Sequence, residues 1–182
     1  MVDGVIMSKQ VDVAKIIGAM HEGMGALQKY EKELFYELDL HMDRLSAAAG
    51  ENADFGKIKK YNDSYKSTLS KLSGQMGQSL GYIDQLVEQA KSGRIKDVEG
   101  VNSELQKTYG TIISSSAQLY SLIDPQLSQI VVKIYAIEGG IPSDVFTKGC
   151  RILKDYFLGD EMVAKIKGEA ASAQGSEMPL AA

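Results

Sequence analysis

This sequence of 182 residues has little of what secreted, membrane-spanning or disulfide-bonded proteins depend on. Cys150 is the only cysteine, so no intrachain disulfide can form and the chain does not require an oxidising compartment. No run approaches the roughly 18 consecutive apolar residues of a transmembrane helix. The opening residues, MVDGVIMSKQ, lack the apolar stretch of a secretory signal. These absences predict a cytoplasmic protein.

An excess of basic charge is also missing. The formal net charge is −4, whereas nucleic-acid-binding domains usually carry a basic face. The nearest approach to such a face is a group of lysines in the second quarter of the chain. They are Lys57, Lys59, Lys60, Lys66 and Lys71. Because Asp54 and Asp63 partly offset them, we expect a solvated helix face and no nucleic-acid partner.

Catalytic and metal-binding motifs are absent as well. The chain has no phosphate-binding loop and no nucleophile elbow. Cys150 has no histidine after residue 41 to act as its base, so it is expected to be a buried, small apolar residue. A di-iron centre needs histidines on two helices, but His21 and His41 both lie in the first predicted helix. Glu33, Glu37 and His41 form a ladder that is typical of solvated charge. The sequence predicts neither an enzyme, nor a cofactor, nor a metal site.

What the sequence does have is long apolar periodicity. Residues 8–49 and 54–92 keep apolar side chains at a helical spacing of three and four residues. In the second stretch a heptad runs through Phe55, Ile58, Asn62, Tyr65, Leu69, Leu72, Met76, Ser79, Ile83, Leu86 and Ala90. Each helix would be roughly 60 Å long, and its apolar stripe needs a partner to cover it. The short connection between the two predicts an antiparallel hairpin.

Weaker helix signals follow the hairpin. Ser103 begins a capping box for a third helix. The pair Asp124-Pro125 indicates the start of a fourth helix, which is expected to end at Glu138. A fifth helix is expected to be capped by Ser143 and closed by Gly159. No strand pattern competes with these helices.

The predicted fold is therefore all-α. A long antiparallel helical hairpin is extended by the third helix to a three-helix coiled bundle, and short helices form a C-terminal cap. The expected division is a flexible N-terminus at 1–7, the long bundle at 8–123, a small helical cap at 124–167 and a disordered tail at 168–182. The tail is expected because alanine, serine, glycine and glutamate dominate it.

Glycines interrupt both long helices. Six interior glycines forgo about 5 kcal/mol of helix propensity relative to alanine. If the chain turns back near residues 51–52, the glycines of the two helices lie at one height. Small residues at helical spacing let two backbones approach closely, and the same positions would also suit a hinge. The positions predicted to serve close packing or a hinge are Gly18, Gly25, Gly74, Gly77 and Gly81.

The preferred function is that of a non-enzymatic structural or adaptor protein. It would act by coiled-coil-like self-association or by binding another helical protein, with apolar positions packed into a partner's groove. The expected partner interface consists of Leu69, Leu72, Met76, Ile112, Leu119, Phe146 and Phe157. The apolar pattern of these helices does not distinguish core positions from interface positions.

The alternative function is that of a peripheral membrane-binding or pore-forming protein. Segment 16–27, IIGAMHEGMGAL, is apolar and rich in glycine and methionine, which is compatible with conditional insertion into a bilayer. Glu22 opposes insertion unless it is protonated. His21 would make insertion sensitive to acid.

Overall fold

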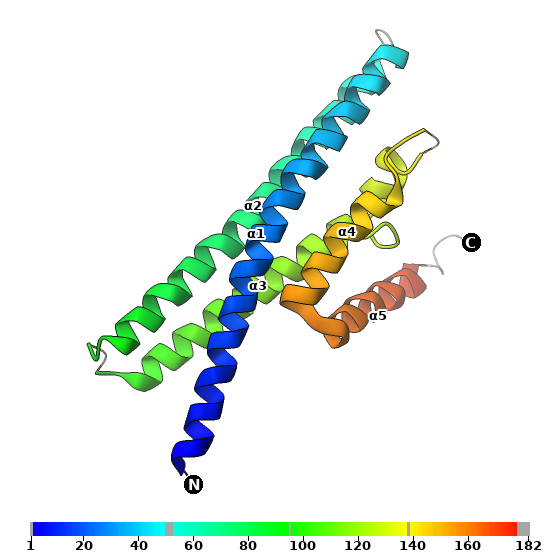
Figure 1. Ribbon diagram of the computed structural model, residues 1–182. Coiled ribbons are helices and arrows are strands. Elements are labelled where there is room, and N and C mark those ends of the chain that lie inside the picture. The colour runs from blue at the N-terminus through cyan, green and yellow to red at the C-terminus, as the bar shows by residue number, and fades with distance from the viewer. Residues whose placement is uncertain (1, 50–52, 95, 138, 178–182) are drawn as a thin grey trace.

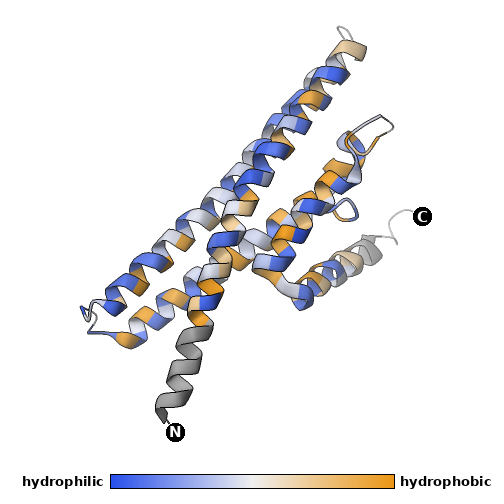
Figure 2. Ribbon diagram, viewed as in Figure 1, coloured by the Kyte–Doolittle hydropathy of each residue, from blue (hydrophilic) through white to orange (hydrophobic). Residues whose placement is uncertain are grey.

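The computed structural model describes residues 2–49, 53–94, 96–137 and 139–177. Within these ranges all the regular secondary structure is helical, and the helices pack against one another (Figure 1). The prediction of an all-α fold is therefore confirmed. Along each helix, hydrophobic residues recur at short intervals with hydrophilic ones between them (Figure 2).

Three long helices dominate the molecule. Helix α1 spans Val2–Ala49, α2 spans Ala53–Lys91 and α3 spans Val98–Ile123. The first two run side by side in opposite directions, and α3 lies along α2 (Figure 1). Helix α1 has 48 residues, which corresponds to a length of about 72 Å. It begins at Val2, so residues 2–7, predicted to be flexible, belong to the helix.

Helix α3 begins earlier than the sequence predicted. The carboxylate of Asp97 caps it by accepting a hydrogen bond of 2.9 Å from the backbone N–H of Gly100. An aspartate at this position satisfies a first-turn N–H that has no partner within the helix. The predicted start at Ser103 is therefore wrong, because an N-cap that lies six residues earlier already holds the first turn.

The fourth predicted helix is largely replaced by a turn. The side chain of Asp124 accepts a 2.7 Å hydrogen bond from the N–H of Gln126, and the carbonyl of Asp124 accepts from the N–H groups of Leu127 and Ser128. A carboxylate bonded two residues ahead makes a local turn in place of a helix cap. Only a short π-helical segment follows, η1, which spans Val131–Tyr135.

The C-terminal region is more helical than predicted. Helix α4 spans Ser143–Leu153 and continues directly into a π-helical turn, η2, at Lys154–Leu158. The predicted stop at Gly159 is confirmed by its φ of 73°, a left-handed conformation that glycine adopts without strain. Ser143 does not cap α4; Pro142 holds the cap position without a side-chain hydrogen bond.

The last helix, α5, spans Gly159–Glu177. Residues 168–177, predicted to belong to a disordered tail, are therefore helical. Residues 178–182 lie outside the described part of the chain. The apolar side of α5 includes Val163, which is buried, and Ile166, which packs against the core. From this packed part the helix continues into the alanine-rich and serine-rich sequence that suggested disorder, and alanine has the highest helix propensity.

Candidate functional site

The seven residues predicted to form a partner interface all lie in the core of the chain itself. Leu69, Leu72, Met76, Ile112, Leu119, Phe146 and Phe157 are buried in one hydrophobic cluster. None of these side chains is available to a partner in this conformation, so their assignment to an interface is corrected. The helices meet along the predicted stripes, so these side chains make their contacts within the chain.

Close helix packing does not explain most of the predicted glycines. A Cβ atom added at Gly18, Gly25, Gly74 or Gly81 would meet nothing within 4 Å. At Gly77 it would make an ordinary contact, 3.7 Å from the terminal methyl of Met24. Their proposed role in close packing is therefore corrected for four of the five positions. The hinge alternative stays a prediction.

The close approaches lie at two other glycines. A Cβ at Gly23 would lie 2.5 Å from Cβ of Tyr156 and 2.9 Å from the ring of Phe157. A Cβ at Gly149 would collide with the ring of Tyr30. Gly23 brings α1 against η2, and Gly149 brings α4 against α1. The residue spacing carried no signal that separates these two glycines from the others, because the contacting residues are distant in sequence.

The N-terminal part of α1 extends past the other helices (Figure 1). The side chain of Met20 is 2% exposed, whereas those of Val13 and Ile16 are 49% and 47% exposed. All three residues belong to the apolar stripe of α1, which therefore continues beyond the part of the helix that the bundle covers. We call residues 13–19 the projecting segment. Within it Ile17 packs partly against the core, whereas Val13 and Ile16 leave about half of their surface exposed.

The segment proposed for membrane insertion contributes one side of its helix to the core. Met20, Met24 and Leu27 are buried, and Gly23 lies against η2. Nε2 of His21 lies 2.9 Å from a carboxylate oxygen of Asp84 on α2. Among the described residues, no helix is long and apolar enough to cross a membrane.

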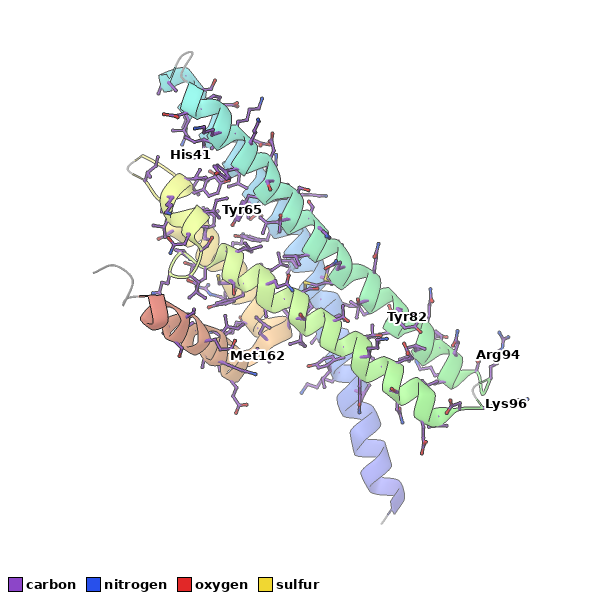
Figure 3. The ribbon with its side chains drawn as sticks, turned by 180° about the vertical axis from the view of Figure 1, so that it is seen from behind. His41, Tyr65, Tyr82, Arg94, Lys96 and Met162 are labelled. Carbon is purple, nitrogen blue, oxygen red and sulfur yellow. The ribbon has the colours of Figure 1, made fainter. Side chains whose placement is uncertain are left out.

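A buried polar network joins η1 to the two longest helices. Nε2 of His41 lies 2.9 Å from the carbonyl oxygen of Ile134. The Tyr135 hydroxyl donates a 2.7 Å hydrogen bond to Oδ1 of Asn62. The Tyr65 hydroxyl donates a 2.7 Å hydrogen bond to the carbonyl oxygen of Leu122. Figure 3 shows His41 and Tyr65 close together at this end of the molecule. The first two contacts hold η1 against α1 and α2, and the third holds the end of α3 against α2.

Aromatic rings surround this network. The ring of Tyr135 lies 5.4 Å from that of Tyr65 and 6.0 Å from that of Phe146, centroid to centroid. Burial raises the pKa of Tyr65 and of Tyr135 above the usual range of tyrosine. Both phenols therefore stay neutral and act as hydrogen-bond donors. The other ring nitrogen of His41, Nδ1, is buried without a hydrogen-bond partner in the described residues.

The groups considered for chemistry lie apart from one another. Cys150 is buried, and burial with the negative charge of Asp124 raises the pKa of its thiol to about 12. In the glutamate and histidine ladder, Glu33 pairs with Lys148 at 2.6 Å. The described residues contain no group of three or more histidine, cysteine or acidic side chains that could hold a metal ion.

Open grooves mark the surface of the described chain. Of three such grooves, the largest, about 560 Å³, lies between α1 and α4, and the Glu33–Lys148 pair lines it. A second groove of about 350 Å³ lies between α2, the end of α3 and the turn after Asp124. A third, about 420 Å³, lies at the α2–α3 connection, where Figure 3 places Arg94 and Lys96.

Known proteins give no family assignment. No protein-family model matches the chain. No curated protein matches it, and no solved structure matches it. The function proposed below is therefore argued from the geometry of the chain alone.

Proposed function

We propose that this chain is a non-enzymatic structural or adaptor protein that associates with a second copy of itself through the projecting segment of α1. The observation that carries the proposal is the apolar stripe of α1, which is buried at Met20 and exposed at Val13 and Ile16. In this proposal α1, α2 and α3 act as a coiled bundle that supports the segment.

The physical argument is that a half-exposed apolar stripe gains stability when a second helix covers it. Burial of apolar surface contributes about 25 cal/mol per Å², so two copies of a valine and an isoleucine add a few kcal/mol at most. A second copy carries the identical stripe, and a two-fold axis brings the same patch of each subunit together. Helical backbone continues from the segment to Val2.

The test is the molar mass and the shape of the protein over a range of concentrations. Light scattering on a size-exclusion column should give twice the monomer mass for the natural chain. The double variant Val13→Glu, Ile16→Glu should dimerise at least about tenfold more weakly, a loss of about 1.4 kcal/mol. X-ray scattering on the same peak should show the dimer to be longer than the monomer.

Tyr36→Glu is the matched control, because Tyr36 is an exposed apolar residue of the same helix outside the projecting segment. This variant should keep the mass of the natural chain. A natural chain that stays monomeric at all concentrations would refute self-association. A dimer that survives the double variant would place the interface elsewhere.

The membrane-binding alternative draws on the same exposed stripe, but the contacts of segment 16–27 weigh against it. Insertion would remove Met20 and Met24 from the core. Insertion would also break the contact between His21 and Asp84, whose side-chain atoms lie 2.9 Å apart. Co-sedimentation with anionic liposomes at pH 5 and pH 7 separates the two functions. Recruitment of a monomeric chain at acidic pH would favour the alternative.

A further inference from the structure

The second groove differs from the others in its charge. Its ten lining residues include no charged side chain, whereas the largest groove is lined by Lys32, Glu33, Glu37, Asp144 and Lys148. The remaining grooves described above and one beside Tyr82 also carry charged residues. We call the second groove the neutral groove. In a chain with 24% charged residues, an uncharged groove of this size selects against ionic ligands.

Hydroxyl groups, an amide and apolar side chains line the neutral groove together. We call the polar lining side chains that reach the surface the rim. They are Tyr61, Ser64, Thr68, Ser121 and Gln129, whereas Ser128 is buried. Leu122, Leu127 and Ile130 supply apolar surface. Tyr61 is 60% exposed, so its side chain is accessible to a ligand in the groove.

Both walls of the neutral groove are fixed before any ligand binds. The Tyr65 hydroxyl ties α2 to the carbonyl oxygen of Leu122 at the end of α3. The Asp124 turn then sets the direction of the chain through its hydrogen bonds to Gln126 and Ser128. A preformed groove loses little conformational entropy on binding, which favours affinity.

Several rim groups remain available for hydrogen bonds. The Tyr61 hydroxyl, the Ser64 and Ser121 hydroxyls and the Gln129 amide make no hydrogen bond to the described residues. A hydroxyl group donates one hydrogen bond and accepts two, and an amide does both. The rim therefore offers donors and acceptors in one neutral surface.

We propose that the neutral groove binds a neutral oligosaccharide. A pyranose ring combines an apolar C–H face with hydroxyl groups at its edge, which suits a neutral lining that mixes apolar side chains with hydroxyl groups. The exposed Tyr61 ring stacks on a sugar face, and the serine and glutamine side chains exchange hydrogen bonds with sugar hydroxyls. The inference goes beyond self-association and does not depend on it, because the groove shares no residue with the projecting segment.

The experiment is saturation-transfer NMR on the full chain with neutral trisaccharides of glucose, mannose and N-acetylglucosamine, followed by titration of any that binds. We expect at least one to bind with a dissociation constant on the order of 1 mM. Tyr61→Ala should weaken binding about 5–10-fold, the contribution of one aromatic contact. Ser121→Ala should weaken it by a smaller factor.

Tyr82→Ala is the matched control, because Tyr82 is an exposed tyrosine further along α2 (Figure 3). It should bind the sugar as tightly as the natural chain, and circular dichroism should show every variant to be folded. The proposal is overturned if no neutral trisaccharide binds at about 10 mM, or if Tyr61→Ala and Tyr82→Ala bind alike. Binding of sialyllactose, an anionic sugar, or of an apolar helical peptide in preference to the neutral sugars would also overturn it.

Discussion

The hydroxyl group of Tyr135 donates a 2.7 Å hydrogen bond to the side-chain oxygen of Asn62, and 73 positions of chain separate the two residues. Both side chains are buried. Asn62 occupies one position of the apolar heptad in α2, where a polar group costs free energy unless it is hydrogen-bonded. The bond to Tyr135 satisfies it and fixes η1 on the side of α2.

Removing both partners of this bond should destabilise the fold by less than the sum of the two single removals. Tyr135→Phe leaves the Asn62 amide buried without its partner, and we expect it to lower the free energy of unfolding by about 1–3 kcal/mol. Asn62→Leu should do the same to the tyrosine hydroxyl. In the double variant neither group is stranded, so its loss should be smaller than the sum of the two. Urea denaturation measures all three, and additive losses would contradict the coupling.

Two neighbouring glycines of α1 should respond to alanine with opposite signs. Gly23→Ala places a Cβ 2.5 Å from Cβ of Tyr156, so the contact between α1 and η2 must shift, at a cost of about 1–3 kcal/mol. Gly25→Ala adds a Cβ that meets nothing within 4 Å and should stabilise the helix by about 0.5–1 kcal/mol. Thermal unfolding of the two variants checks the signs. Equal stability would show that Gly23 does not mark a close approach.

The ion pair between Glu33 and Lys148 should give the carboxyl a recognisable titration. The hydrogen bond from Lys148 lowers the pKa of Glu33 below its ordinary value. The pair therefore contributes stability above the ordinary glutamate pKa, and this contribution is lost as the pH falls through the lowered pKa. In Lys148→Met the Glu33 pKa should rise toward the ordinary value. Carboxyl chemical shifts followed by NMR measure it, and an unchanged titration would contradict the pairing in solution.

Cys150 should be unreactive in the folded chain. Burial raises the pKa of its thiol to about 12, so the nucleophilic thiolate is scarce at pH 8. We expect a disulfide reagent such as Ellman's to label the folded protein far more slowly than the protein in urea. The labelling rate as a function of urea concentration should follow the unfolding transition. Rapid labelling of the folded chain would show that the region around α4 opens locally.

Much of the secondary structure follows from the sequence because its causes are local. The three-and-four spacing of apolar residues predicts the two longest helices, and Gly159 ends the helical turn before it by adopting a positive φ. A local sequence pattern gives the wrong secondary structure where two local hydrogen-bonding arrangements compete. Asp124 before Pro125 suits both a helix cap and a turn, and the hydrogen bond to Gln126 favours the turn.

The allocation of apolar residues to core or surface was decided by the tertiary structure. Leu69 and Val13 belong to similar helical stripes, yet Leu69 is buried and Val13 is half exposed, because only one of them faces a neighbouring helix. The close approaches at Gly23 and Gly149 likewise depend on residues that are distant in the chain. Periodicity specifies which face of a helix is apolar. The packing of several helices at once determines how far along each helix that face is covered, and where the uncharged groove beside Tyr61 is formed.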